Sequence, residues 1–235
     1  MANISLDING AIGTGWEYAK KYGLLIAVIY LAVGMLSSGL QNMLGGSLDP
    51  SLIEEMNRAI QRGDSNAFLK VAEAYNAGIG SSIGLILSSI IQLIVTVGLY
   101  NLAIGLMTGR YQSVEFGAFQ MPVSVYVKVV VVEFLVGIID CIALFCCVVP
   151  FFIVAPRLVF AGLYAIEHPE AGIIDAIKAS WNMTSGNLVS LLLLGLAMVG
   201  ISILGFMCCC VGIYFADVIS LFALVAAYYQ LKGNL

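Results

Sequence analysis

The chain has little charge and a single histidine. Only 10% of its 235 residues are charged, against about a quarter in soluble domains, whereas 61% are hydrophobic. The lone His168 excludes multi-histidine metal sites, and it leaves a serine nucleophile without a base inside a membrane. The sequence also lacks a phosphate-binding glycine loop and a long basic run, so nucleic acid is not an expected partner. This composition indicates a polytopic membrane protein.

Long apolar runs predict an all-α fold with six transmembrane helices, since a crossing needs about 20 residues. The runs cover residues 22–44, 79–107, 123–149, 151–166, 188–207 and 211–231. Pro150 separates the third run from the fourth, and the triplet Cys208–Cys210 separates the last two, so both pairs are expected to form tight hairpins. We therefore predict one integral membrane domain of three hairpins: residues 1–110 with an external helical loop at 46–78, residues 111–168, and residues 169–235.

Basic residues set the expected orientation. One side of the membrane would carry Lys20, Lys21, Arg110, Lys128, Lys178 and Lys232, and the other side Arg58, Arg62 and Lys70 in a single acidic loop. The positive-inside rule then places both termini in the cytoplasm. The N-terminal stretch lacks the pattern of a cleaved signal peptide, so we expect the first span to remain in the protein.

Two stretches of the chain resemble each other. Residues 11–23 read AIGTGWEYAKKYG, residues 176–188 read AIKASWNMTSGNL, and each precedes an apolar run. A stretch of similar length and mixed character ends at Pro122, ahead of the third run. These flanks predict a short amphipathic helix in the interface before each hairpin, with Trp16 and Trp181 as anchors at the headgroup level. A chance match between two tryptophan-containing flanks is the alternative.

The second of these stretches carries a resemblance to known proteins. The segment GIIDAIKASWNMTSGNLVSLLLL resembles a helix that precedes the penultimate span in a group of bacterial integral membrane proteins of unknown function. The matching residues, called the Ser-Trp motif below, are Ala176, Ser180, Trp181, Thr184, Gly186 and Asn187. The resemblance extends to the membrane domains of glycerophosphodiester phosphodiesterases, although this chain has no room for the enzyme domain. It implies a fold and a bacterial inner membrane, and it supplies neither a catalytic residue nor a substrate.

The six cysteines are predicted to gather near one face of the membrane. The third run contains Cys141, Cys146 and Cys147, and the tip of the last hairpin contains Cys208, Cys209 and Cys210. Their spacing matches no standard metal-ligand pattern, and free cysteine is a common small core residue. We therefore expect packing residues and no cofactor. A disulfide between the tips, or a soft-metal site on Cys146, Cys147 and Cys208–Cys210, are the alternatives.

Three charged residues are predicted to share one depth inside the membrane. Arg157 lies seven residues after Pro150, Asp140 lies ten before it, and Asp217 lies seven after the cysteine triplet. An intramembrane charge costs at least about 2.5 to 3.5 kcal/mol, so such residues usually pair or line a wet cavity. An ion pair that fixes helix packing, and a site for a cation, a proton or a polar headgroup, are both open interpretations. Glu133 lacks an evident partner and would extend the polar path toward the cytoplasm.

These features favour a protein without catalytic activity. An intramembrane protease needs two aspartates that share a proton, and Arg157 between Asp140 and Asp217 would hold both ionised. We therefore expect a scaffold or accessory subunit that acts on membrane partners or lipids. The alternative is a small transporter or channel that uses Asp140, Arg157 and Asp217. Membrane lipids, a second copy of the chain or another membrane protein are the expected partners.

Overall fold

The structure is a computed structural model that describes residues 5–44, 54, 57–58, 60–62, 82–146, 148–207 and 211–234. These ranges are mainly helical and contain no strand. Six helical segments in them are long and apolar enough to cross a membrane: Ile8–Leu40, Leu87–Met107, Val123–Cys146, Val149–Glu167, Leu188–Met207 and Gly212–Leu231. The prediction of an all-α polytopic membrane protein is therefore confirmed.

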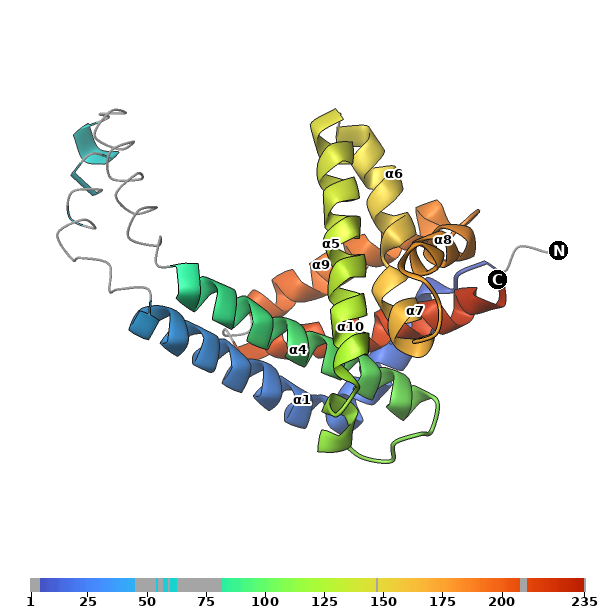
Figure 1. The fold of residues 1–235 in the computed structure, drawn as a ribbon, viewed down its shortest axis with the longest axis horizontal. Coiled ribbons are helices and arrows are strands. Elements are labelled where there is room, and N and C mark those ends of the chain that lie inside the picture. The colour runs from blue at the N-terminus through green and yellow to red at the C-terminus, as the bar shows by residue number, and fades with distance from the viewer. Residues whose placement is uncertain are drawn as a thin grey trace. The chain divides into compact units, whose positions relative to one another are not determined.

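Figure 1 shows the described helices, and the chain divides into two compact units. Their order along the chain is α1 (Ile8–Leu44), α4 (Ser82–Met107), η1 (Phe116–Phe119), α5 (Val123–Cys146), α6 (Val148–Leu158), α7 (Ala161–Glu167), α8 (Ile173–Met183), α9 (Leu188–Met207), α10 (Val211–Leu231) and η2 (Lys232–Asn234). One unit is Leu31–Leu93, and the other joins Met1–Tyr30 to Ile94–Leu235. The second, called the main unit below, contains every site discussed here.

The smaller unit contains the loop that was predicted to be helical at 46–78. Most of that loop lies outside the described residues, and its described positions between Glu54 and Arg62 are helical. There the Arg58 guanidinium lies 3.0 Å from the Glu54 carboxylate one turn earlier. Both side chains are exposed, so this ion pair contributes little stability.

The second hairpin turns earlier than expected. The sequence predicted a turn at Pro150, but α5 ends at Cys146 and α6 already begins at Val148 (Figure 1). Pro150 instead occupies the first turn of α6. Backbone N–H groups in that turn have no partner within the helix, so the N–H that proline lacks is not needed there. The two arms then run antiparallel, and the Glu133 carboxylate of α5 lies against Gly162 of α7.

The fourth span consists of two helices. α6 ends at Leu158, and α7 begins at Ala161. Pro156 removes one backbone donor from the last turn of α6, and the chain leaves helical geometry three residues later. This break lies inside the candidate span Val149–Glu167, where its free backbone groups need partners other than water.

The short helices expected before the hairpins take three forms. Before the third hairpin, α8 is a separate helix, and its Asp175 carboxylate accepts the Gly172 N–H at 3.1 Å. Before the second, the chain forms only the single turn η1, between the positive φ of Gly109 (75°) and Pro122. Before the first, residues 11–23 contain no proline and continue into the span as one helix, α1. Among the described residues, a separate short α-helix therefore precedes the third hairpin alone.

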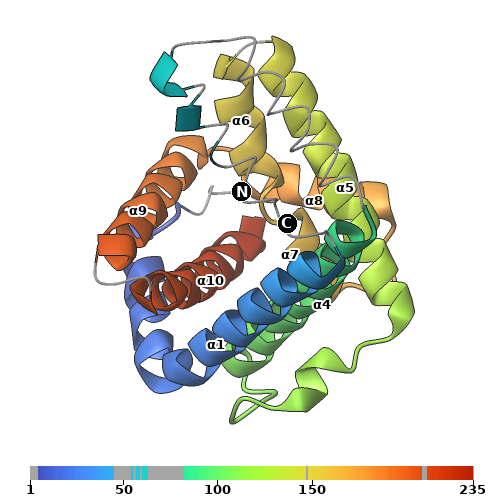
Figure 2. The same ribbon diagram turned by 90° about the vertical axis from the view of Figure 1, so that its left-hand side faces the viewer.

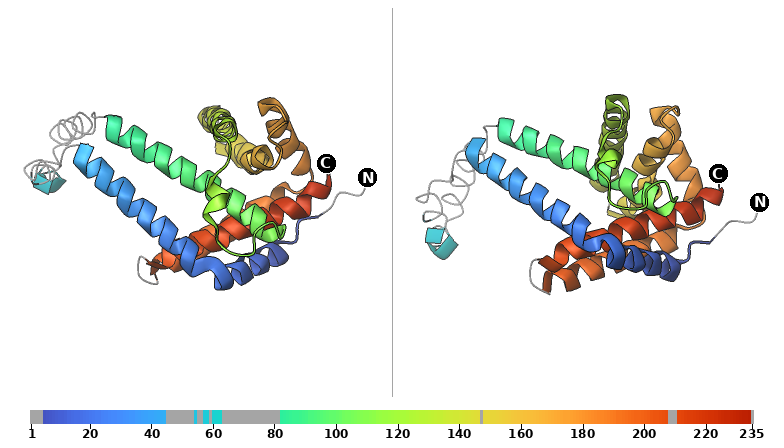
Figure 3. Two further views of the ribbon diagram at one scale, coloured as in Figure 1. Left: turned by 60° about the horizontal axis from the view of Figure 1, so that its bottom comes forward. Right: turned by 90° about the horizontal axis from the view of Figure 1, so that it is seen from below.

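The first part of α1 packs along α10 in an antiparallel direction (Figure 3). Tyr18 stacks on Phe222 with 5.1 Å between ring centroids, and Gly23, later in α1, contacts Phe215, earlier in α10. On another side of α10 lies α9, the first arm of the third hairpin (Figure 2). α10 is thus held between the start of α1 and α9.

Candidate functional site

The break between α6 and α7 forms the best-defined polar site of the main unit. Where the helix stops, the Arg157 carbonyl and the Phe160 N–H lose their helical partners. Ser180 of α8 replaces both: its hydroxyl donates to the Arg157 oxygen at 2.7 Å, and its oxygen accepts the Phe160 N–H at 3.2 Å. Ser180 is fully buried, so it supplies the partners that a broken backbone requires away from water.

Other residues of the Ser-Trp motif complete the same junction. The Thr184 hydroxyl lies 3.3 Å from the Arg157 carbonyl oxygen. Gly186, just after α8, has a φ of 82°, a conformation that favours glycine. Asn187 is buried, and its Oδ1 atom accepts the Leu6 N–H at 2.9 Å. The motif therefore joins α8 to the broken span and to the start of the chain.

The Arg157 side chain contacts an indole, and it pairs with no carboxylate in the described part of the chain. Its guanidinium lies 4.6 Å from the ring centroid of Trp181, in a cation–π contact. Among the residues that the structure describes, no ion pair joins it to Asp140 or Asp217, and its buried Nε atom has no hydrogen-bond partner. The predicted contact between this arginine and the two aspartates is therefore not formed as an ion pair.

The earlier turn of the hairpin also shifts the depth of these charges. Asp140 lies six residues before the end of α5, and Arg157 lies nine residues after the start of α6. At about 1.5 Å per residue, the two backbones differ by about 4.5 Å in depth, close to one helical turn. The Asp140 Oδ1 atom is buried and accepts no hydrogen bond from the described part of the chain.

Glu133 and Asp217 also form no ion pair with this arginine among the described residues. The Glu133 carboxylate lies against Gly162, and Asp217 is half-buried on α10. No hydrogen bond or ion pair between described residues links either of them to Asp140 or Arg157. A continuous polar path through these side chains stays a prediction.

The sequence did not reveal an ionic cluster at the end of α7. Glu167 accepts hydrogen bonds from the Tyr228 hydroxyl at 2.5 Å and the Tyr229 hydroxyl at 3.2 Å, and it pairs with Lys232 at 2.7 Å. Only 15% of the Glu167 side chain is exposed, so this pair is better shielded than a usual surface ion pair. The sequence could have pointed to this cluster through Glu167 at the end of one apolar run and the pair Tyr228 and Tyr229 near the end of another. Their contact depends on which helices are neighbours, which the sequence does not give.

Two further contacts fix the same end of the main unit. The Asp7 N–H donates to the Gln230 side-chain oxygen at 2.9 Å, which fastens the start of α1 to the end of α10. The Lys128 ammonium donates to the carbonyl oxygens of His168 at 2.7 Å and Pro169 at 3.1 Å. The start of α5 is thus held to the turn that follows α7.

The two tryptophan-containing stretches share a pattern of exposure. Ala11 corresponds to Ala176 and Ala19 to Thr184, and all four are buried. The two tryptophans, Trp16 and Trp181, are both half-exposed. The residue before each tryptophan contacts the backbone of another element: Gly15 meets α10, and Ser180 meets the α6–α7 break. The rings differ in their neighbours, because Trp16 packs edge-on against Phe215 and Trp181 contacts a guanidinium. A common place for both rings in the headgroup layer stays a prediction.

The predicted cysteine site lies largely outside the described residues. This applies to Cys147 and to Cys208–Cys210. Cys141 and Cys146 are described, and both are exposed free thiols. The described ranges contain no group of three or more His, Cys, Asp or Glu side chains placed to hold a metal. A tip disulfide and a soft-metal site therefore stay predictions.

No protein-family model matches the chain, and neither a curated protein nor a solved structure matches it significantly. The functional interpretation consequently depends on the residues themselves. The junction built by Ser180, the contact of Arg157 with Trp181 and the cluster around Glu167 are its strongest polar features.

Proposed function

We propose that the chain is a multi-pass membrane scaffold or accessory subunit without catalytic activity, which holds a membrane protein partner. The uncovered apolar surface of α9 carries this proposal. Only 11% of the most apolar window of that span is buried within the chain. Leu196 and Leu204 on α9 are 67% and 64% exposed. Close helix packing is what joins subunits within a membrane, and the face of α9 that is turned away from α10 and α6 is available for it.

The use of the motif residues supports a structural role. The Ser180 hydroxyl and the Asn187 amide oxygen, which the Ser-Trp motif singles out, bind backbone groups of the same chain. A catalytic side chain must instead be free to contact a substrate. The motif therefore supports a fold whose most distinctive polar residues hold the helices in place.

Photo-crosslinking tests the scaffold role. A benzoylphenylalanine introduced at Leu196 or Leu204 in cell membranes is expected to give a discrete protein adduct, because both side chains are about two-thirds exposed. The control position is Leu194 on the same helix, which is 1% exposed and should give no adduct to a second protein. If neither exposed position yields a protein adduct, the partner proposal is wrong.

The proposal includes a bacterial inner membrane and cytoplasmic termini. The basic residues that flank the span ends support this orientation. The bonds of Leu6 to Asn187 and of Asp7 to Gln230 support one common side for both ends of the chain. The Ser-Trp motif supports a relation to the bacterial membrane proteins of unknown function and to the membrane domains of glycerophosphodiester phosphodiesterases.

A second candidate function is a transporter or channel for an ion, a proton or a lipid headgroup. Two buried polar atoms favour it: Asp140 Oδ1 and Arg157 Nε have no hydrogen-bond partner among the described residues. Groups of this kind inside a span are costly unless a ligand, water or a second charge satisfies them. An ion or a headgroup that visits Asp140 and Arg157 would remove that cost.

Proteoliposomes separate the two candidate functions. The scaffold proposal predicts that liposomes with the purified protein take up protons no faster than empty liposomes, as measured with an internal pH dye. A proton flux that Asp140→Asn abolishes would instead establish the transport function. Glu170→Gln is the matched control, because Glu170 is an exposed carboxylate outside the spans.

A further inference from the structure

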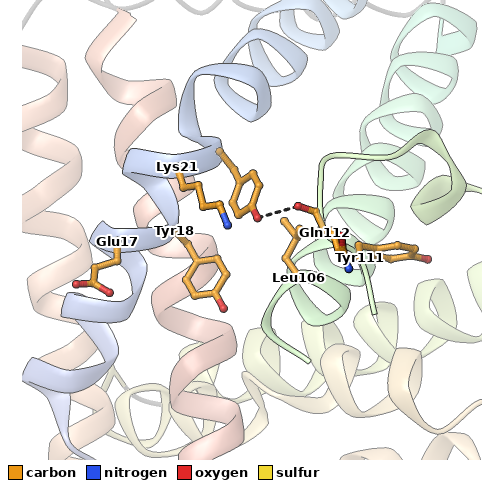
Figure 4. A pocket seen from close by; sticks show the side chains of 7 residues that line it. Glu17, Tyr18, Lys21, Leu106, Tyr111 and Gln112 are labelled. Atoms are coloured by element: carbon orange, nitrogen blue, oxygen red, sulfur yellow. Dashed lines mark hydrogen bonds between the residues drawn. The ribbon is translucent and has the colours of Figure 1, made fainter. Parts of the chain in front are cut away.

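A polar cavity opens where the second span ends, between α1 and the segment that follows α4 (Figure 4). Its volume is about 540 Å³, large enough for a lipid headgroup. It is lined by Glu17, Tyr18, Lys21, Tyr22, Leu106, Tyr111 and Gln112. Leu106 is the penultimate residue of the candidate span Leu87–Met107, so the cavity lies at the depth where hydrocarbon gives way to headgroups.

The wall formed by the segment after α4 is held in place. The Tyr111 N–H donates to the Gly105 carbonyl at 3.0 Å, and the Tyr111 ring lies against Gly105, where a side chain would collide with it. The Tyr22 hydroxyl of α1 donates to the Gln112 carbonyl oxygen at 3.1 Å and joins the two walls. The cavity is therefore formed by ordered backbone and two fixed tyrosines.

Two opposite charges, Glu17 and Lys21, lie at the cavity and form no ion pair with a described residue. Glu17 and Lys21 are four residues apart on α1, a spacing that usually allows an ion pair. No ion pair forms between them, and Figure 4 shows their charged ends turned apart. The Lys21 ammonium interacts with the Tyr22 side chain, 4.9 Å from its ring centroid, and Glu17 and Lys21 are both exposed. One anion and one cation that do not neutralise each other lie at a single cavity, and they suit a ligand that carries both charges.

We propose that this cavity binds the headgroup of a zwitterionic glycerophospholipid that contains a phosphate and a primary ammonium. Lys21 would contact the phosphate, and Glu17 would contact the ammonium, with the tyrosine rings as further cation–π surface. A purely anionic headgroup leaves Glu17 opposed by like charge, and a trimethylammonium group cannot donate a hydrogen bond to it. The inference rests on the proposed membrane function and names a class of lipid that the protein would bind. Its test is independent, since crosslinking from α9 and lipid binding at α1 can fail separately.

Lipid titration of the delipidated full chain in detergent, followed by native mass spectrometry, tests the site. The probes are short-chain phosphatidylethanolamine, phosphatidylcholine and phosphatidylglycerol, with free phosphoethanolamine to separate a lipid from a soluble headgroup. We expect Lys21→Gln and Glu17→Gln each to weaken phosphatidylethanolamine binding by about tenfold, the loss of one charge contact. Glu17→Gln should leave phosphatidylglycerol binding unchanged or tighter.

Lys20→Gln is the matched control, because Lys20 carries the same charge, lies over Trp16 and does not line the cavity. Its effect should stay below about twofold. Equal losses for Lys20→Gln and Lys21→Gln, no loss for Glu17→Gln, or wild-type binding of phosphatidylglycerol as tight as that of phosphatidylethanolamine would each overturn the proposal. Tighter binding of free phosphoethanolamine than of the lipid would overturn the lipid assignment. Because Glu17 and Lys21 are exposed, the thermal midpoint should not move, and this shows that each variant is folded.

Discussion

Ser180→Ala is expected to lower the free energy of unfolding by about 2 to 4 kcal/mol, although it removes a single oxygen atom. The substitution leaves the Phe160 N–H without its acceptor and takes from the Arg157 carbonyl its shorter bond, of 2.7 Å. Thr184 stays near that carbonyl at 3.3 Å, so the N–H carries most of the loss. Inside a span no water replaces the missing partner, and the full cost of an unsatisfied donor applies.

Thermal unfolding of the purified protein in a mild detergent measures this effect. Ser185→Ala is the matched control, because Ser185 is exposed two residues after the end of α8 and its hydroxyl makes no hydrogen bond with a described residue. It should change the free energy of unfolding by less than about 0.5 kcal/mol. Equal midpoints for Ser180→Ala and Ser185→Ala would show that the junction does not depend on the serine.

The six spans were predictable because a span needs only length and apolar composition, and both are properties of a continuous stretch of sequence. The boundary at Met107 and the range 188–207 agree with the structure for this reason. The break within the fourth span was not predicted. Pro156 is visible in the sequence, but whether a helix tolerates a proline depends on partners such as Ser180, far along the chain.

The position of the second hairpin turn shows a different limit. A proline was expected to mark the turn, but proline is equally suited to the first turn of a helix, where its N–H is not needed. Pro150 takes that place in α6, and the turn precedes it. The sequence offers the same residue for both roles, and the packing of α5 against α6 decides between them.

The candidate charge cluster shows why depth alone does not define a site. Counting residues from the hairpin turn gives the level of Asp140 and Arg157, but the direction of each side chain depends on how each helix is rotated. That rotation follows from packing, and it turns Arg157 toward Trp181 on α8. Ser180 and Trp181, the two α8 residues that contact the broken span, both belong to the Ser-Trp motif, but the sequence did not reveal what they bind.

Gly15→Ala is expected to destabilise the protein by about 1 to 3 kcal/mol, because it adds a methyl group where two backbones meet. That methyl carbon would lie 2.6 Å from the Ile219 carbonyl oxygen and 3.0 Å from the Ala223 backbone nitrogen of α10. Backbone atoms inside a helix cannot move aside as a flexible side chain does. The start of α1 would therefore have to shift away from α10, with loss of the neighbouring stack of Tyr18 on Phe222.

Gly13→Ala on the same helix is the matched control, and its effect should have the opposite sign. A methyl group at Gly13 meets no atom within 4 Å, so alanine there only reduces the conformational freedom of the unfolded chain and favours the helix, by about 0.5 to 1 kcal/mol. Thermal midpoints in detergent should thus fall for Gly15→Ala and rise for Gly13→Ala. If both midpoints rise, α1 does not lie against α10. The similarity between Gly15 and Ser180, which both contact the backbone of another element, would then be contradicted as well.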